Sequence, residues 1–285
     1  MKWIQTHALT ARQQEQIRSL QETCRRAEPF GHSVFLSGEL NHFGEMDCFF
    51  LGYEGQALAA VLTLFQPDAR EAEVTAFVRP DLRRQGRFTA LFAAARAELE
   101  RFGVSSVLFF HEPVCASGGE VLKRFPVERH HTEYLMEYDR TAAPAVPVLP
   151  LELEPATREL LPRLAELSAA AFGDAAADSR EKVERFFAAP AVNGYAARLD
   201  GRVVGHLFCN TEGGEAYLCD FCVEPALQGR GIGRSILALV LARVRRETEL
   251  PIRLEVDAVN DHALGLYTAC GFRETARCDY WRMAL

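Results

Sequence analysis

The sequence predicts an α+β protein made of two consecutive copies of one fold, each a mixed, mostly antiparallel sheet flanked by helices. Three observations lead to this class. An apolar stretch at residues 217–223 is followed by a glycine-rich turn and then by a helical pattern. A similar order of residues occurs 145 positions earlier. A segment rich in proline and alanine, at residues 141–149, separates the two halves.

The repeat keeps its register over a long stretch. Gly86 and Gly231 are 145 residues apart, as are Pro80 and Pro225, and the apolar strand 106–110 has its counterpart at the same spacing. A chance match of glycines would not keep one spacing over so many residues, so one structural unit is predicted to occur twice. The predicted domains are residues 1–140 and 150–285, joined by a linker at 141–149.

In the first half, Ile17, Leu20 and Cys24 recur at helical spacing. Apolar and aromatic runs on either side of Gly55 predict two strands joined by a tight turn. The predicted elements are, in order, a helix at 10–27, strands at 47–53, 57–65 and 71–78, a helix at 88–102, and strands at 106–111 and 130–139.

The second half repeats this order. A turn around Gly201 joins two strands, and Ile236, Leu237, Val240 and Leu241 mark the helix that follows the glycine-rich turn. The predicted elements are a helix at 157–171, strands at 194–199, 203–210 and 215–223, a helix at 231–248, a strand at 252–257, a short helix at 261–269 and a strand at 274–284.

The glycine-rich turn has the properties of an anion site. The first N–H groups of a helix have no partner within the helix and carry partial positive charge. Gly229, Gly231 and Gly233 allow a ligand to approach the backbone closely. A phosphate ester suits such a site best. The turn lacks the lysine of a P-loop, and Arg234 breaks the spacing of a dinucleotide fingerprint.

Residues 228–233 do match the pattern Q/R-x-x-G-x-G/A and resemble the pyrophosphate loop of the GNAT acyltransferases, which bind acetyl-CoA. Residues 254–272 resemble a second pattern of that family, L-E-V-x-x-x-N-x-x-A-x-x-L-Y-x-x-x-G-F, at nearly every fixed position. On these two signatures the second half is identified as a member of the GNAT superfamily, and the chain resembles two tandem GNAT folds.

The resemblance implies specific roles for residues of the second half. Tyr267 stands at the general-acid position, where it would protonate the departing thiolate. Asn260 matches a residue that contacts the pantetheine arm or holds the acid, and it can also cap the short helix. The residues expected to bind the coenzyme are Phe221, Cys222, Val223, Gln228, Gly229, Arg230, Gly231, Ile232, Gly233, Arg234, Asn260 and Tyr267.

Two carboxylates compete for the role of general base. Glu255 lies five residues before Asn260, which matches the proposed base of enzymes that acetylate a ribosomal protein N-terminus. Asp220, on the neighbouring strand, is the alternative. An oxyanion that develops during transfer needs main-chain N–H donors, which the ends of diverging strands provide.

The first half departs from these patterns. At the spacing of 145, Cys115 stands in place of Asn260 and Leu122 in place of Tyr267, and neither can perform the family role. Phe88 replaces Gly233 and is expected to crowd the loop, although Gly86 remains. The first half is therefore predicted to be catalytically silent, so that each chain has one productive acetyl-CoA site.

Composition narrows the classes of function. The chain has 285 residues, 48% of them hydrophobic, and a net charge of −7, which disfavours nucleic-acid binding and leaves cationic amines as acceptable substrates. No apolar run is long enough for a membrane span, and the first residues do not form a signal peptide. We therefore expect a cytoplasmic protein with reduced cysteines, as a monomer or homodimer.

No metal site is expected. Cys219 and Cys222 form a C-x-x-C, but residues three apart in a strand face opposite ways. No other cysteines and histidines have ligand spacing, including the pair His130 and His131. The resulting expectation is an acetyl-CoA-dependent N-acetyltransferase for a primary amine of a small molecule or peptide N-terminus. The alternative is a non-catalytic acyl-CoA-binding sensor or interaction module.

Overall fold

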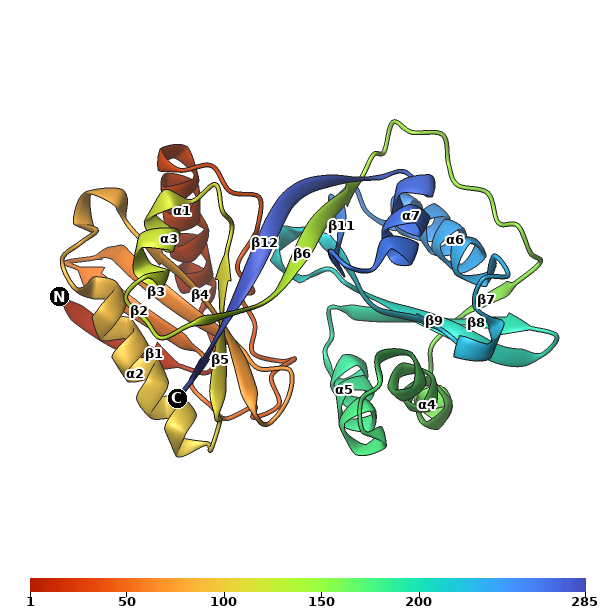
Figure 1. Cartoon of the computed structure of the whole chain (residues 1–285), viewed down its shortest axis with the longest axis horizontal. Coiled ribbons are helices and arrows are strands. Elements are labelled where there is room, and N and C mark those ends of the chain that lie inside the picture. The colour runs from red at the N-terminus through yellow and green to blue at the C-terminus, as the bar shows by residue number, and fades with distance from the viewer. The chain divides into compact units, whose positions relative to one another are not determined.

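The computed structural model describes residues 1–285 and divides them into two compact units (Figure 1). Unit 1 consists of residues Met1–Glu133 and Ala276–Leu285, and unit 2 of residues Tyr134–Thr275. The division differs from the predicted 1–140 and 150–285, because the last ten residues belong to unit 1. They do so because Asp279–Ala284 pair in register with Ser106–His111. No helix is long and apolar enough to cross a membrane.

The sheet of unit 1 has the order β1-β2-β3-β4-β5-β12. Its strands are β1 (Lys2–Thr6), β2 (Phe49–Glu54), β3 (Ala57–Phe65), β4 (Glu71–Val78), β5 (Ser106–His111) and the end of β12 (Phe272–Ala284). Only β4 and β5 pair in parallel, as the right-handed connection through a helix requires.

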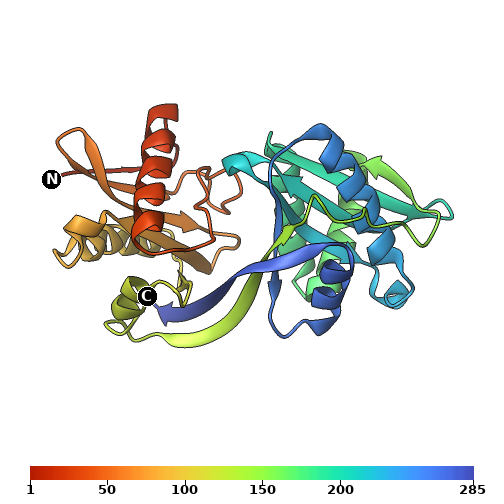
Figure 2. The same cartoon turned by 90° about the horizontal axis from the view of Figure 1, so that it is seen from above.

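Two helices of unit 1 pack on opposite faces of this sheet (Figure 2). Helix α1 (Ala11–Ala27) begins at a capping box on Thr10 and buries Ile17 against Leu51 and Val61. Helix α2 (Arg87–Arg101) covers the other face, where Leu91 packs with Phe50 and Leu62. Successive residues of a strand thus face two different cores, which explains why β2 and β3 are mostly apolar on both faces. A short helix, α3 (Ala116–Leu122), follows β5.

Unit 2 repeats the arrangement with the order β6-β11-β10-β9-β8-β7. The strands are β6 (Glu128–Tyr138), β7 (Glu152–Pro155), β8 (Val192–Leu199), β9 (Arg202–Asn210), β10 (Ala216–Val223) and β11 (Ile252–Asp257). Strands β10 and β11 are parallel, whereas β7, β8, β9 and β10 pair antiparallel. By the division into units, β6 belongs to unit 2 only from Tyr134 onward.

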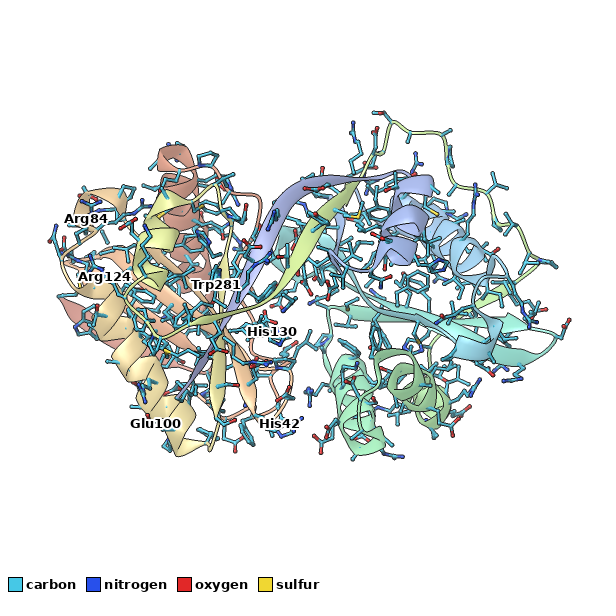
Figure 3. All side chains as sticks on the ribbon, viewed as in Figure 1. His42, Arg84, Glu100, Arg124, His130 and Trp281 are labelled. Carbon is cyan, nitrogen blue, oxygen red and sulfur yellow. The ribbon has the colours of Figure 1, made fainter.

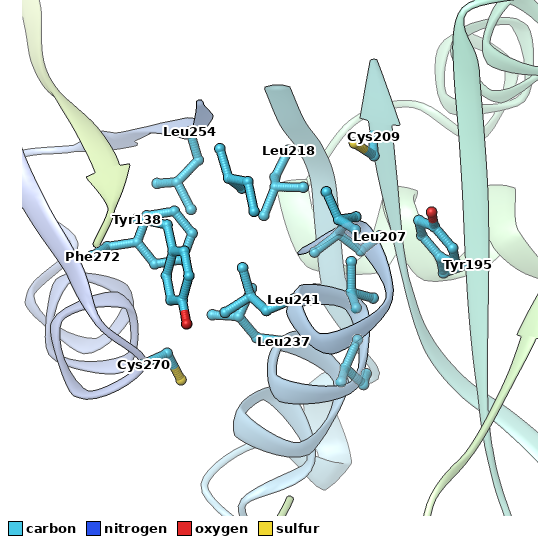
Figure 4. Close-up of a cluster of buried hydrophobic side chains, with 14 of the residues drawn as sticks. Tyr138, Tyr195, Leu207, Cys209, Leu218, Leu237, Leu241, Leu254, Cys270 and Phe272 are labelled. Atoms are coloured by element: carbon cyan, nitrogen blue, oxygen red, sulfur yellow. The ribbon is translucent and has the colours of Figure 1, made fainter. Parts of the chain in front are cut away.

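The helices of unit 2 also pack against both faces of its sheet. Helix α6 (Ile232–Glu247) buries Leu237 and Leu241 against Leu207 and Leu218 in the core shown in Figure 4. Helices α4 (Leu161–Phe172) and α5 (Ala176–Ala188) cover the opposite face, around Phe208. Helix α7 (Asp261–Ala269) follows β11. The fold class and the predicted helices and strands are confirmed, with ends that shift by up to a few residues.

Four elements were absent from the prediction, namely β1, α3, β7 and α5. Helix α5 buries only Ser179 and Val183 fully, and charged residues make up much of its sequence, so its apolar face is narrow. Helix α3 contains two adjacent glycines, which lower helix propensity. Strands β1 and β7 are mostly exposed and lie at the edges of the sheet order, where an apolar pattern is weak.

Candidate functional site

The two parallel strands of unit 2 separate after two pairs, and we call the region between their unpaired parts, Leu218–Val223 and Leu254–Asp257, the cleft. Strands β10 and β11 pair only at Ala216 with Ile252 and at Tyr217 with Arg253. Beyond these pairs, the edge of β10 that faces β11 has no strand partner. The main chain of Phe221, Cys222 and Val223 lies in this stretch, so it can pair with the amides of an extended ligand.

The glycine loop lies beyond the open end of β10. A 3₁₀ turn at Pro225–Leu227 leads into Gly229, with φ 73°, and Gly231, with φ 83°. Gly231 is the N-cap of α6, and no side chain caps the helix there. The first N–H groups of α6 are therefore available to an anion. Around them, Gln228, Arg230 and Arg234 are exposed, while Ile232 is buried in the core.

The glycines of the loop have different surroundings. A Cβ on Gly233 would come within 3.4 Å of Leu266 and 3.6 Å of Phe221, so this glycine faces the side of the cleft. A Cβ on Gly231 would come within 2.6 Å of Val148. The N–H groups of Val148 and Leu149 both donate to Ser235 Oγ at 3.0 Å. Residues 148–149 therefore form a strap across the start of α6, and Gly231 makes room for this strap.

Tyr267 lies beside the cleft. Its ring centroid is 6.4 Å from that of Phe221 on β10 and 5.9 Å from that of Phe272. Burial raises the pKa of Tyr267 to about 12, so the phenol keeps its proton at neutral pH. Asn260 caps α7, because its side chain accepts from Ala263 N at 3.1 Å.

Glu255 is half-buried on β11, two residues past the last pair with β10. Its Oε2 accepts a hydrogen bond from Tyr217 Oη at 2.7 Å. The bond holds the carboxylate on the part of β11 that diverges from β10. Glu255 is thus a carboxylate fixed at the cleft by a neutral donor.

Asp220 has a different environment. Cys219 pairs with Phe208 and Cys222 with His206, so Asp220 and Phe221 both lie opposite one residue of β9. This β-bulge places Asp220 at φ 46°, which is unusual for a residue other than glycine. The side chain of Asp220 is 3% exposed.

Three side chains from three elements reach the Asp220 carboxylate. Ser168 of α4 donates to Oδ1 at 3.0 Å, Lys182 Nζ of α5 lies 2.8 Å from Oδ1, and His206 Nε2 of β9 lies 2.8 Å from Oδ2. We call Ser168, Lys182, His206 and Asp220 the bulge network. Although burial opposes ionisation, His206 and Lys182 lower the pKa of Asp220 to about 2.

The other members of the bulge network, Ser168, Lys182 and His206, were not predicted from the sequence. Lys182 lies on α5, a helix that was not predicted, and Ser168 is a small polar residue in an apolar helix. His206 stands in the middle of the apolar run of β9 and is fully buried. A histidine in such a run needs a polar partner, and this requirement was the signal available in the sequence.

The bulge also corrects the expectation for the C-x-x-C. Cys219 and Cys222 do not face opposite ways, because the extra residue turns both toward the core beneath α4 and α5. Burial raises the pKa of both thiols, so they stay protonated. Cys222 Sγ lies 3.3 Å from His206 Nδ1. All eight cysteines of the chain are free.

Unit 1 contains a cavity of about 820 Å³ at the equivalent place. It lies between β4 and β5, whose pairing ends at Val74 and Phe109, and it reaches the loop before α2. Arg84 and Arg124, labelled in Figure 3, are among its lining residues. A volume of this size is typical of ligand sites.

The loop of unit 1 keeps the backbone of its counterpart despite a different sequence. Arg84 has φ 62° where Gly229 has 73°, and Gly86 has φ 76° where Gly231 has 83°. The ring of Phe88, which was expected to crowd the loop, stacks on Phe92 and is among the side chains that line the cavity. The loop conformation is therefore retained, with strain at Arg84.

The side chains that were predicted to take part in acyl transfer have no counterparts in unit 1. At the spacing of 145 residues, the counterparts of Glu255, Asn260 and Tyr267 are Phe110, Cys115 and Leu122. Both Phe110 and Leu122 lack a proton to exchange. Burial, with Glu112 and Glu28 nearby, raises the pKa of Cys115 to about 11, so its thiol is neutral.

Comparison with known proteins identifies the family. The acetyltransferase (GNAT) family pattern matches residues 161–272. N-alpha-acetyltransferase RimI of Mycobacterium tuberculosis is 35% identical over 145 residues, covering 47% of this chain and 87% of RimI. Aminoglycoside N(6′)-acetyltransferase type 1 of Stenotrophomonas maltophilia is 39% identical over 101 residues, covering 32% of this chain and 65% of that protein. The chain belongs to the GNAT family of acetyltransferases.

The likeness in structure extends over both units. A tandem GNAT protein from the clavulanic acid biosynthesis pathway has a TM-score of 0.73 at 17% identity, covering 99% of this chain and 98% of that protein. This similarity shows the fold of both halves. In sequence, the chain spans 65% of the length of the Stenotrophomonas enzyme and 35% of that of a mycothiol acetyltransferase of Clavibacter sepedonicus, to which it is 31% identical over 107 residues.

Proposed function

We propose that this chain is an acetyl-CoA-dependent N-acetyltransferase, and that unit 2 transfers the acetyl group to a primary amine by direct attack in a ternary complex. The observation that carries the proposal is Tyr267, which burial keeps protonated beside Phe221 at the open part of the cleft. A binding module would have no need for a proton donor at this place.

The residues of the cleft fit acetyl-CoA. The uncapped N-terminus of α6 and residues 228–234 would receive the pyrophosphate. Phe221, Cys222 and Val223 would pair with the pantetheine amides through the main-chain edge that β11 leaves open. Asn260 lies at the start of α7, where it would border the arm. The coenzyme would supply the activated acetyl group.

We assign the proton transfers as follows. Glu255, held by Tyr217, accepts the proton that the substrate ammonium group must lose before the neutral amine can attack the thioester. Main-chain N–H groups next to the bulge stabilise the negative charge that develops on the carbonyl oxygen. Tyr267 donates its proton to the leaving sulfur. Asp220 is a poor base, since its low pKa means that it binds a proton only in strong acid.

The acceptor is proposed to be an amine-bearing small molecule or a peptide N-terminus. The net charge of −7 favours such a cation over nucleic acid. We further propose a cytoplasmic monomer or homodimer that needs neither a metal nor a membrane. Eight free cysteines suit a reducing compartment.

For unit 1 we propose the non-catalytic role, in which an acyl-CoA is bound and kept intact. The cavity of about 820 Å³ and the retained loop backbone support binding. Phe110 and Leu122 at the positions of base and acid support the absence of turnover. The catalytic and silent halves would then share one way of holding the coenzyme.

The test is thiol release from acetyl-CoA in the presence of a panel of amines, which includes polyamines, aminoglycosides and alanyl peptides. Mass detection identifies the acetylated product. We expect one class of amine to raise thiol release well above the rate without acceptor. If no amine does so while calorimetry still finds acetyl-CoA bound, the chain is a binding module.

A further inference from the structure

The bulge network has no role in the proton transfers proposed above, yet it is the most elaborate polar cluster of unit 2. Asp220 contacts Ser168, Lys182 and His206, which come from α4, α5 and β9. His206 is fully buried and the Asp220 side chain nearly so. Lys182 Nζ also lies 3.4 Å from Asp174 and 4.6 Å from the centroid of the Phe172 ring. Burying charged groups in this way requires a complete set of partners.

Comparison of the two units shows that the fold does not require this network. In unit 1, β3 and β4 pair without a register shift, and Leu62 lies opposite Ala76 alone. Val61 stands 145 residues before His206, and unit 1 has no helix that corresponds to α5. The bulge and its network therefore occur only in the unit that has Glu255 and Tyr267.

The bulge lies where the conformation of Asp220 determines the direction of main-chain N–H groups at the cleft. The dihedral angles of Asp220 set the plane of the peptide group that carries the N–H of Phe221. The pairs with β11 end at Tyr217, so the main chain after the bulge borders the cleft. A left-handed conformation at an aspartate is strained and persists only where surrounding contacts hold it. Here three side chains hold the carboxylate, and through it the backbone.

We propose that Lys182 and His206 are positioning residues for acyl transfer. They hold Asp220 in its left-handed conformation, and this fixes the direction in which the N–H groups of Phe221 and Cys222 meet the carbonyl oxygen of the thioester. The inference rests on the proposed function of unit 2. Neither Lys182 nor His206 exchanges a proton with the substrate in this role.

The kinetic test uses Lys182→Met, with Lys182→Arg as the conservative variant. Arg180→Met on the same helix is the matched control, because its partner Glu184 is a surface pair. We expect Lys182→Met to lower kcat about 10- to 100-fold, since misplaced donors act on the transition state. The KM for acetyl-CoA should stay within about threefold. Lys182→Arg should recover most of the rate, and Arg180→Met should change nothing.

A spectroscopic test needs no acceptor amine. Donors aimed at the carbonyl oxygen polarise the C=O bond of bound acetyl-CoA, so the stretching frequency of a ¹³C-labelled carbonyl falls below that of free acetyl-CoA. We expect this shift in the wild type and in Arg180→Met and its loss in Lys182→Met. An unchanged shift together with an unchanged kcat in a folded Lys182→Met protein would overturn the inference.

Lys182→Met leaves a buried carboxylate with one partner fewer and can unfold. The double variant Lys182→Met/Asp220→Asn removes the lysine and the carboxylate charge together, so no buried carboxylate is left without its lysine, and it tests the same point. It too should bind acetyl-CoA without the shift, and a retained shift would again contradict the proposal. If the wild type binds no acetyl-CoA, the proposed function itself fails. If the wild type binds and turns over while both variants match it, only the positioning role fails.

Discussion

The Tyr267 phenol is the proton donor in the proposed transfer. No charged neighbour lowers the pKa of Tyr267, and burial alone raises it to about 12. Such a group holds its proton strongly in the resting enzyme. It becomes an effective donor once a thiolate forms beside it, because the proton then moves to a strong base within reach.

Replacing Tyr267 by phenylalanine should therefore lower kcat roughly 10²- to 10⁴-fold. The affinity for acetyl-CoA, measured by calorimetry, should stay within a few-fold because the ring still packs between Phe221 and Phe272. An unaffected kcat would make Tyr267 a packing residue.

The two carboxylates should respond differently to amide substitution. Glu255→Gln should lower kcat/KM for the amine roughly 10²-fold or more, because Tyr217 then donates to a group that accepts no proton. Raising the pH should restore part of this rate, since a larger fraction of the amine is then already neutral. If Asp220 were the base instead, Glu255→Gln would keep the pH profile of the wild type.

Asp220 also predicts a pH dependence of stability. Its pKa falls from an ordinary 3.8 to about 2 on folding, so the ionised form stabilises the native state above about pH 4. This contribution, about 2 kcal/mol, is lost as the pH falls toward 2. Urea unfolding of wild type and Asp220→Asn should show a difference in free energy at neutral pH that shrinks in acid. A difference independent of pH would assign the stabilisation to packing.

At the scale of the elements, the strap at residues 148–149 adds a steric contact to the effect of any substitution at Gly231. Gly231→Ala places a methyl group against Val148, whereas Gly229→Ala meets no atom within 4 Å, and both glycines have a positive φ. The strain of a positive φ should lower the free energy of unfolding of each variant by about 1–2 kcal/mol. Only Gly231→Ala should lower the free energy of unfolding further, because of the contact with Val148. Combining it with Val148→Ala should restore this additional loss. Equal losses in denaturant unfolding would exclude the contact with the strap.

The prediction of elements from sequence succeeded where a residue pattern has one physical cause. The strand, loop and helix around residues 215–248 combine an apolar strand, fixed glycines and helical spacing, and the structure has them as expected. Helix α5 was not predicted because it buries few residues, and the network around Asp220 was therefore not predicted either. At the bulge, Asp220 contacts side chains of α4, α5 and β9, and no local pattern in the sequence encodes such tertiary contacts.

At the scale of the whole molecule, the two glycine loops allow a matched comparison. Gly86 and Gly229 both have a positive φ and open space around a Cβ, so Gly86→Asp and Gly229→Asp impose similar strain and charge. Gly229→Asp should remove turnover by repelling phosphate from α6, and Gly86→Asp should leave turnover nearly intact. Calorimetry should count one coenzyme fewer in each variant. Turnover lost through Gly86→Asp alone would place catalysis in unit 1.

Residues Ala276–Leu285 belong to unit 1, and Asp279–Ala284 among them pair with β5. During synthesis, residues 1–133 of unit 1 are made before unit 2, whereas the strand residues that cover the edge of β5 are made only after unit 2. The nascent first half therefore has an open sheet edge at β5 until residues 279–284 have been made. A fragment that ends in the linker should aggregate, and a separate peptide of residues 276–285 should relieve this. Cutting the gene at the linker would thus not yield two independent proteins, although the repeat in the sequence suggests that it would.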